Sequence, residues 1–341
     1  MARERIVSGS QENPAEDKVQ LSLRPKLLNE YIGQQELRDK IKVTLEAARQ
    51  RKEAIEHVLF YGPPGLGKTT LAHIIANEMG TKLYATAGPA LQRTGDLMGI
   101  LTNLKEGDIL FIDEIHRLSS TIEEFMYPAM EDYKVDFVVD KGAFAKVINV
   151  PLKRFTLVGA TTRAGMLSAP LRDRFGLYYH LDFYPANELK EIVIRSARLL
   201  ETEIESDAAE IIALRSRGTP RIANRLLRRV RDYSAVKSDG VIKTEIAATA
   251  LDAEGVDSIG LDQLDRKMLQ IIIEYYKGGP VGIEALAATL NEEIDTLVDM
   301  VEPYLLKIGF VQRTKRGRVV SQDACQHLGM KFPDSSQTNL F

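Results

Sequence analysis

The chain has 341 residues, of which 44% are hydrophobic and 27% are charged, and its formal net charge is −3 at pH 7. This length fits two or three globular domains, and the small net charge neither requires nor excludes a nucleic-acid partner, because a local basic surface can lie within a near-neutral total. The lone Cys325 excludes an intramolecular disulfide, and no run of about 18 apolar residues and no signal-peptide core is present, so we expect a cytoplasmic protein without a membrane span.

We expect a large α/β domain over residues 19–185, preceded by a disordered N-terminus over residues 1–18. Between residue 37 and about residue 184, helical patterns alternate with short apolar runs. These runs cover residues 57–61, 82–87, 108–113, 155–161 and 178–183. Such alternation predicts a parallel sheet, with the functional loops at the carboxyl ends of its strands.

The first apolar run is followed by residues 62–69, GPPGLGKT, which fit the spacing G-x-x-x-x-G-K-[ST]. Apolar side chains at helical spacing come next, so the segment joins a strand to a helix, as a phosphate-binding loop requires. Glycines such as Gly65 and Gly67 let backbone N–H groups face phosphate oxygens at the helix N-terminus. Lys68 would reach the β- and γ-phosphates, and the Thr69 hydroxyl would ligate Mg²⁺. The alternative is an ordinary glycine-rich turn.

A second apolar strand, residues 109–112, ends in Asp113 and Glu114. In a phosphate-binding domain Asp113 would hold the metal through water, and Glu114 would polarise the attacking water. The alternative is a buried strand that ends in a solvated acidic turn. Together with the loop upstream, the pair predicts hydrolysis of ATP with Mg²⁺ as the metal.

Beyond residue 185 the expected strands stop, and residues 186–256 show helical periodicity alone. Thr219 and Pro220 predict one helix start there, with Thr219 as the capping residue. Residues 257–332 then carry three helical patterns and two strand-like runs around residues 315–317. This order predicts a small helical domain followed by a winged helix, with a generic helical protein-binding domain as the alternative. The last nine residues, 333–341, are expected to form a loose tail.

Two further segments predict contacts with partners. The segment 312–318, QRTKRGR, places four cations in seven residues with no acid. Arg313 and Arg318 are spaced so that a turn would place them across a hairpin, both facing a DNA phosphate backbone. The segment 134–150 predicts a second hairpin with the apolar Phe144 near its tip, where a solvated loop is normally polar. The alternatives are a solvated charge run and a Phe144 side chain folded back on its own domain.

The loop, the Asp-Glu strand end, a threonine-rich strand end and a helical lid together resemble the AAA+ ATPases, a family that works as rings with nucleotide at each subunit boundary. The resemblance makes Thr162, within GATTRAG, a sensor that positions water or the γ-phosphate. It makes Arg174, in preference to Arg172, the finger that reaches the neighbouring subunit's ATP. Arg221 would be the second sensor. The alternatives are surface ion pairs for the two candidate finger arginines and a simple strand-end role for Thr162.

Four longer segments, residues 23–34, 131–165, 168–176 and 308–318, resemble the RuvB family of bacterial Holliday-junction branch-migration motors, and the likeness covers about residues 18–332. The resemblance implies a hexameric ring in DNA recombination and repair, the junction-recognising partner RuvA docked at Phe144, and the resolvase RuvC in the larger complex. It also implies ATP contacts from Leu23, Arg24, Gly65, Lys68, Thr69, Thr70, Glu131, Asp132, Tyr133, Tyr184 and Arg221.

The favoured hypothesis is therefore an ATP-driven ring that pumps duplex DNA so that a four-way junction migrates. Its expected fold is an α/β P-loop AAA+ core with a parallel sheet, a small all-helical lid domain and a C-terminal winged-helix domain. One alternative is a clamp-loader subunit, in which a helical collar would replace the winged helix. Another is a DNA-binding regulator that uses nucleotide only as an assembly switch, which an intact Glu114 and finger arginine disfavour.

Overall fold

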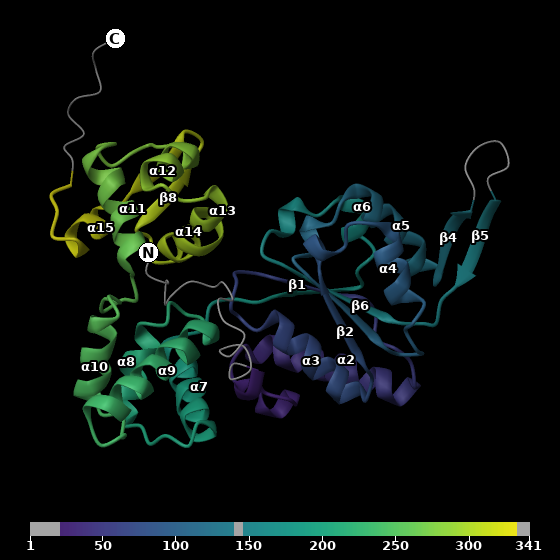
Figure 1. Ribbon diagram of the computed structural model, residues 1–341, viewed down its shortest axis with the longest axis horizontal. Coiled ribbons are helices and arrows are strands. Elements are labelled where there is room, and N and C mark those ends of the chain that lie inside the picture. Colours follow the sequence, from purple (N-terminus) through teal and green to yellow (C-terminus); the bar gives the residue numbers. More distant parts are fainter. Residues whose placement is uncertain (1–20, 140–145, 333–341) are drawn as a thin grey trace, which may run out of the picture. The chain divides into compact units, whose positions relative to one another are not determined.

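The short apolar runs of the N-terminal half form one parallel sheet. In the computed structural model, which describes residues 21–139 and 146–332, the strand order is β2-β3-β6-β1-β7 (Figure 1). The strands are β1 Val58–Tyr61, β2 Leu83–Ala87, β3 Ile109–Asp113, β6 Thr156–Thr161 and β7 Leu177–His180. Every neighbouring pair is parallel, so the carboxyl ends of these strands share one sheet edge. The predicted parallel α/β sheet is confirmed.

Helices cover both faces of this sheet (Figure 1). They are α2 Gln35–Arg51, α3 Lys68–Met79, α4 Thr94–Leu101, α5 Ser120–Glu131 and the short α6 Ala169–Arg172. Leu110 and Ile112 of β3 are buried in a cluster with the apolar side chains of α4 and α5. Alternate strand residues point to opposite faces, so Ile109 and Phe111 face the side on which α3 contacts β3. Both faces are buried, which explains the uninterrupted apolar pattern of the strand.

A separate antiparallel pair extends the same unit. Strands β4 Lys134–Val139 and β5 Lys146–Pro151 pair with Val135 opposite Val150. The two strands of the predicted hairpin over residues 134–150 are therefore confirmed. Phe144 lies outside the described residues.

The chain divides between Asp182 and Phe183 into two compact units. The helical lid and the winged helix belong to the same unit. The expected domain ranges 19–185, 186–256 and 257–332 stay predictions. The expected disordered N-terminus and C-terminal tail lie outside the described residues. Within the described residues, 21–139 and 146–332, no helix has the length and apolarity needed to cross a membrane.

The second unit opens with four helices, α7 Ala186–Leu199, α8 Ser206–Leu214, α9 Pro220–Lys237 and α10 Thr244–Ala253. Pro220 begins α9 as predicted. The prediction that the Thr219 side chain caps this helix is wrong, because its hydroxyl donates instead to the carbonyl of Ser216 at 3.4 Å. Thr219 occupies the cap position only through its extended backbone.

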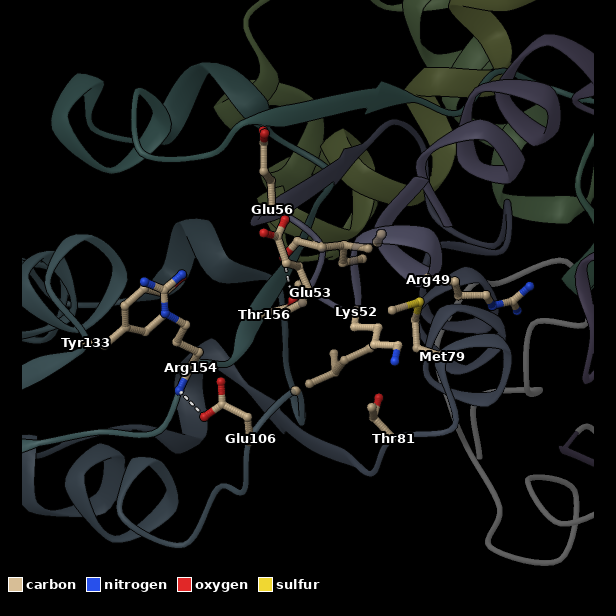
Figure 2. A pocket seen from close by; sticks show the side chains of 15 residues that line it. Arg49, Lys52, Glu53, Glu56, Met79, Thr81, Glu106, Tyr133, Arg154 and Thr156 are labelled. Atoms are coloured by element: carbon tan, nitrogen blue, oxygen red, sulfur yellow. Dashed lines mark hydrogen bonds between the residues drawn. The ribbon is translucent and has the colours of Figure 1, made fainter. Parts of the chain in front are cut away.

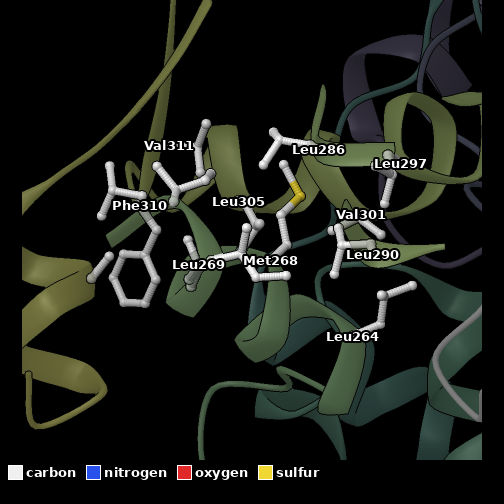
Figure 3. Close-up of a cluster of buried hydrophobic side chains, with 14 of the residues drawn as sticks. Leu264, Met268, Leu269, Leu286, Leu290, Leu297, Val301, Leu305, Phe310 and Val311 are labelled. Atoms are coloured by element: carbon white, nitrogen blue, oxygen red, sulfur yellow. The ribbon is translucent and has the colours of Figure 1, made fainter. Parts of the chain in front are cut away.

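The remaining elements are α11 Gln263–Glu274, α12 Ile283–Leu290, α13 Ile294–Thr296, a π-helical turn Leu297–Val301, α14 Glu302–Lys307, β8 Val311–Thr314, β9 Gly317–Val320 and α15 Gln322–His327. This is the predicted winged-helix order. The third helical pattern is interrupted because Pro303 has no amide hydrogen and cannot continue a regular α-helical ladder. Figure 3 shows the core, where Met268 and Leu305 lie among the other apolar side chains of the domain.

The wing is a tight hairpin. Thr314 pairs with Gly317 across the two-residue loop Lys315-Arg316, and Arg313 lies directly opposite Arg318. Gly317 has a φ of 135°, and a side chain there would collide with the backbone of Val281. The predicted position of the two arginines across the hairpin is confirmed.

Candidate nucleotide-binding site

The loop between β1 and α3 has the backbone that a phosphate cradle needs. Gly62, Gly65 and Gly67 have φ values of 140°, 81° and 105°, which L-amino acids with side chains rarely adopt. A Cβ at Gly62 would collide with the carbonyl of Leu181. Helix α3 begins directly after the loop at Lys68, so the first amides of the helix point into it. The loop can therefore hold phosphate oxygens without a side chain in the way.

Lys68 supplies the charge of this cradle. Its ammonium donates to the carbonyls of Gly62 at 2.7 Å and Pro63 at 2.9 Å, and the residue is buried. The positive charge therefore lies inside the loop, where the β- and γ-phosphates of a nucleotide would bind. Thr69 and Thr70 follow in the first turn of α3, which begins two residues earlier than the predicted helix.

Glu114 has a strained backbone and a partly buried carboxylate. Its φ is 47°, in the left-handed region. Thr162, at the end of β6, donates its hydroxyl to Glu114 Oε2 at 3.1 Å. Burial opposes ionisation of Glu114, but the hydrogen bond with His116, the charge of Lys68 and the Thr162 bond together hold its pKa below the ordinary value. The carboxylate is thus ionised at neutral pH, as a group that polarises water must be.

His116 is a member of this site that the sequence did not reveal. Its Nδ1 lies 3.2 Å from Glu114 Oε2 and 2.9 Å from the hydroxyl of Thr161, and its side chain is 6% exposed. The imidazole therefore connects the acidic end of β3 to the threonine end of β6. The only indication in the sequence that His116 belongs to the site was its position two residues after Glu114.

Asp113 lies at the end of β3 beside the cradle and is partly buried. One carboxylate oxygen accepts the backbone N–H of Glu114 at 3.0 Å, which fixes the orientation of the side chain. The described residues contain no group of three or more His, Cys, Asp or Glu side chains that could hold a metal alone. The Thr69 hydroxyl and the Asp113 carboxylate instead fit a Mg²⁺ that is held mainly by phosphate oxygens and water.

The N-terminal segment packs against the same loop and helix. Leu23 is buried, and the Tyr31 hydroxyl donates to the carbonyl of Leu66 within the loop at 3.4 Å. Burial, and then the charge of Arg24, lower the pKa of His73 on α3, so Arg24 lies near that helix. Tyr31 thus ties this segment to the loop, and Leu23 and Arg24 stay predicted nucleotide contacts.

Other predicted nucleotide contacts lie elsewhere in the unit. Arg174 donates to Glu131 at 3.1 Å and to the carbonyl of Pro170 at 2.7 Å, and its guanidinium stacks on Tyr127 at 4.3 Å. Arg172 is exposed on the adjacent turn. Gly176, two residues beyond Arg174, bonds to the carbonyl of His57, just before β1 begins. Arg174 and Glu131 therefore group at the amino end of β1, whereas the cradle follows its carboxyl end.

Tyr133 belongs to this second group. Its ring centroid is 6.3 Å from that of His57, and Asp132 precedes it on the exposed end of α5. Figure 2 shows Tyr133 beside Arg154 in a pocket of about 580 Å³, which is also lined by Ile109 and Thr156, the first residues of β3 and β6. The strands separate this edge from the cradle by about 13 Å, since four residues rise 3.3 Å each.

Tyr184 and Arg221 lie in the second unit. The amide of Tyr184 donates to the carbonyl of Gly218 at 2.9 Å, and Arg221 is the second residue of α9. The start of the lid and the start of α9 are thus joined to each other. Both residues stay predicted nucleotide contacts.

The two predicted DNA-binding arginines share a buried carboxylate. Glu302, the first residue of α14, binds Arg313 at 2.9 and 2.5 Å and Arg318 at 2.8 and 3.2 Å. Its side chain is 0% exposed, whereas that of Arg313 is 52% exposed and that of Arg318 16%. Burial opposes ionisation of Glu302, but the two arginines hold its pKa below the ordinary value. Residues 312–318 contain no acidic side chain, but Glu302 on α14 supplies a carboxylate that pairs with their arginines.

Three family models match successive parts of the chain. They are the Holliday junction DNA helicase RuvB P-loop domain over residues 23–181, the RuvB AAA lid domain over 184–257 and the RuvB C-terminal winged helix domain over 258–329. The chain belongs to the RuvB family. The solved RuvB Holliday junction branch migration motor of Thermotoga maritima is 53% identical, with a TM-score of 0.84, over 92% of this chain and 100% of that one. Two point-mutant structures of that RuvB are each 52% identical, with TM-scores of 0.84 and 0.83, over 92% and 91% of this chain and 100% and 99% of theirs.

Membership of the RuvB family decides between the functions that the sequence left open. The chain is a P-loop ATPase and a Holliday-junction branch-migration motor, and it acts on DNA. A clamp-loader subunit would carry a helical collar where this chain has a RuvB winged helix. The DNA-binding regulator that uses nucleotide only as an assembly switch is excluded as well, because this chain belongs to the RuvB family.

Proposed function

We propose that the motor works as a homohexameric ring in which each Mg²⁺-ATP is held by two subunits. The observation that carries this proposal is the separation of the predicted nucleotide contacts into two groups at opposite edges of the sheet. Lys68 and Glu114 lie at the carboxyl edge, whereas Arg174, Glu131 and Tyr133 lie at the amino edge. One nucleotide cannot contact both groups in a single subunit, so the second group serves the ATP of a neighbour.

Within one subunit, the cradle binds and orients ATP. Lys68 and the loop amides bind the β- and γ-phosphates, and Thr69 and Asp113 would hold Mg²⁺, which supplies charge neutralisation to the phosphates. Glu114 polarises the attacking water, and Thr162 fixes the direction of its carboxylate. Arg221 contacts phosphate from the lid as the second sensor.

The neighbouring subunit completes the site with its arginine finger. A guanidinium placed against the γ-phosphoryl group spreads the charge of the transition state. Arg174 is favoured over Arg172 because its side chain is already oriented by Glu131, Pro170 and Tyr127. The finger is thus held in place before it meets a nucleotide, which lowers the entropic cost of that contact.

The winged helix grips duplex DNA through Arg313 and Arg318 on the wing. A motor that runs over any sequence must hold phosphates instead of base edges, since phosphate contacts position a protein without specifying sequence. Glu302 fixes both guanidinium groups at the hairpin, and Lys315 and Arg316 extend the cationic surface at its exposed tip.

The hairpin of β4 and β5 docks the junction-recognising partner RuvA, and RuvC joins the larger complex. The antiparallel pairing of the two strands supports this proposal. The contact residue Phe144 lies outside the described residues. The single Cys325 and the lack of a signal-peptide core in the sequence support a cytoplasmic location for the complex.

Electron microscopy with a slowly hydrolysed ATP analogue and a four-way DNA junction tests the ring. The expected particles contain six subunits, with density for nucleotide between the cradle of one subunit and Arg174 of the next. Nucleotide enclosed within single subunits would contradict the proposal. In a separate assay, Phe144→Asp should abolish RuvA-dependent branch migration and leave basal ATP hydrolysis intact, and unchanged affinity for RuvA would refute the docking site.

A further inference from the structure

A charged side chain is buried where the helical lid meets the winged helix. Arg217 lies in the loop between α8 and α9, and its residue is 2% exposed. Its Nη2 donates to Oδ1 of Asp265 on α11 at 3.0 Å, and the Asp265 side chain is 0% exposed. The other oxygen of Asp265 accepts the amide of Asp262 at 2.8 Å and so caps α11. The pair thus connects the loop before α9 to the first helix of the winged helix.

An aromatic ring forms the second side of this contact. The Arg217 guanidinium lies 4.8 Å from the ring centroid of Tyr304 on α14. Burial raises the pKa of Tyr304 to about 12, so its hydroxyl stays protonated and donates to the carbonyl of Ile259 at 2.6 Å. Arg217 is therefore held by both α11 and α14.

The neighbouring residue also touches α14. A Cβ at Gly218 would collide with the ammonium of Lys307, and that ammonium lies 4.3 Å from the ring centroid of Phe183. The φ of Gly218 is 74°, a backbone conformation that favours glycine there. The lid loop therefore approaches α14 through its backbone as well as through Arg217.

Packing alone does not account for Arg217. Its φ is 55°, a left-handed conformation for a residue with a long side chain, and its Nη1 is buried without a hydrogen-bond partner. A buried ion pair can often be replaced by apolar residues without loss of stability. A strained, incompletely paired arginine at this position therefore indicates a role that an apolar contact would not perform.

The contacts of α14 place its two ends in different functional regions. Glu302, at the start of the helix, binds the wing residues Arg313 and Arg318. Tyr304 and Lys307, further along, contact the lid loop. Arg217 in turn precedes Arg221, the proposed second sensor, by only four residues. One short helix thus lies between the proposed DNA grip and the proposed phosphate sensor.

We propose that Arg217 and Asp265 form a latch through which DNA held on the wing changes the rate of ATP hydrolysis. They are positioning residues that act through Arg221, because the latch fixes the loop from which α9 begins. The inference rests on the proposed roles of Arg221 and of the wing arginines. The experiment must therefore separate loss of the coupling between DNA binding and ATP hydrolysis from loss of the Arg221 contact with phosphate or of the wing contact with DNA.

The test variant is Arg217→Met combined with Asp265→Asn, which removes both charges and keeps an amide oxygen to cap α11. ATP turnover is measured without DNA and with saturating duplex. The ratio of the two rates should fall from its wild-type value to about one, while the Kd for duplex and its salt dependence stay within about twofold. A ratio as high as that of the wild type would overturn the latch.

The matched control is Lys190→Met with Glu210→Gln, which removes an ion pair of 2.8 Å within the lid, between α7 and α8. This variant should keep the wild-type ratio. If the control loses the ratio to the same extent, coupling depends on general lid stability and the latch is overturned.

Hydrogen exchange on the unmodified protein tests the latch without any substitution. Addition of duplex should change amide exchange in residues 215–221 and leave α10 unchanged. No change in residues 215–221 would overturn the latch even if the variant failed to fold. A wild-type protein whose ATP turnover does not respond to DNA would instead contradict the proposed function, which distinguishes the two failures.

Discussion

The hydroxyl of Thr162 donates a 3.1 Å hydrogen bond to the carboxylate of Glu114, although the residues are 48 positions apart in the chain. Glu114 follows β3 and Thr162 follows β6, and these strands are parallel neighbours. Their carboxyl ends therefore meet at the edge of the sheet where the phosphate cradle lies. The pair joins the carboxylate that we propose to polarise water to the residue that we propose to sense the γ-phosphate.

Glu114→Gln should retain ATP binding and lose turnover. The amide keeps the size of the side chain but cannot accept a proton from water, and general-base contributions are typically about 10²- to 10⁴-fold. Lys68→Ala should instead weaken binding itself, because the phosphate charge loses its partner. Nucleotide affinity and steady-state hydrolysis measure the two effects. Glu124→Gln, an exposed glutamate on α5, is the matched control, and near-normal turnover by Glu114→Gln would remove Glu114 from its role.

His116→Ala should move the acidic limb of the pH–rate profile to higher pH. Burial raises the pKa of Glu114 and the bond with His116 lowers it, so removal of the imidazole leaves the carboxylate protonated at a higher pH. Activity that needs ionised Glu114 is then lost earlier as the pH falls. His116→Asn, which can restore a polar nitrogen near Glu114, should recover part of the shift. An unchanged acidic limb in His116→Ala would show that His116 does not tune Glu114.

These residues show what the sequence could predict of the site. The cradle and the Asp113-Glu114 strand end were predictable because local spacing and alternating strands and helices fix them. The cross-strand positions of Arg313 and Arg318 were predictable because a tight hairpin determines its own register. The expected Thr219 cap failed because the hydroxyl is directed to the carbonyl of Ser216 in the preceding turn and accepts no amide of α9.

Other contacts were not predictable because they join distant elements. Glu302 precedes Arg313 by 11 residues, and no local pattern indicates that α14 brings its carboxylate beneath the wing. Arg217 and Asp265 are 48 residues apart, and each resembles an ordinary surface charge in the sequence. Only the packing of the lid against the winged helix reveals that both are buried.

A mixing experiment tests whether Arg174 acts across a subunit boundary. Arg174→Ala should bind ATP without hydrolysing it, and Lys68→Ala should bind ATP poorly but keep its finger. Co-assembled rings should recover part of the activity, because a Lys68→Ala subunit can supply the finger to an intact cradle beside it. Rates are measured at several mixing ratios, with Arg172→Ala as the control expected to stay active alone. Mixed rings that remain inactive would argue against a finger in trans at Arg174.

Glu302 should stabilise the winged helix in a pH-dependent way. The folded pKa of Glu302 lies below its unfolded value of about 4.3. The stabilisation that the Glu302 carboxylate contributes is therefore complete above the unfolded pKa. It is lost as the pH falls through the folded pKa. Glu302→Gln should lower the free energy of unfolding by about 2 kcal/mol at neutral pH, and its difference from the wild type should shrink below about pH 4.

Calorimetry over a series of pH values measures this difference. Glu292→Gln, at an exposed position in the same domain, is the control and should melt like the wild type. A difference between Glu302→Gln and the wild type that stays constant down to pH 3 would show that folding does not lower the pKa of Glu302.

The contact with Glu302 determines how the DNA grip of the wing must be tested. Replacement of Arg313 and Arg318 alone would leave a buried carboxylate without its partners, and the loss of stability would obscure any loss of DNA binding. The comparison is therefore made in a Glu302→Gln background, with and without Arg313→Ala and Arg318→Ala. In this background the two arginines can be removed without leaving a buried charge.

Loss of the two arginines should weaken duplex binding equally on unrelated sequences, because each phosphate contact releases counterions and reads no base. The slope of log K against log salt should become shallower by about 1.8, or about 0.9 for each contact. DNA-free ATP hydrolysis should survive, since the cradle belongs to the other unit of the chain. Removal of two lid cations, Lys237 and Lys243, controls for net charge and should change the slope less. Normal duplex binding at about 0.15 M salt after loss of both wing arginines would exclude the wing as the DNA grip.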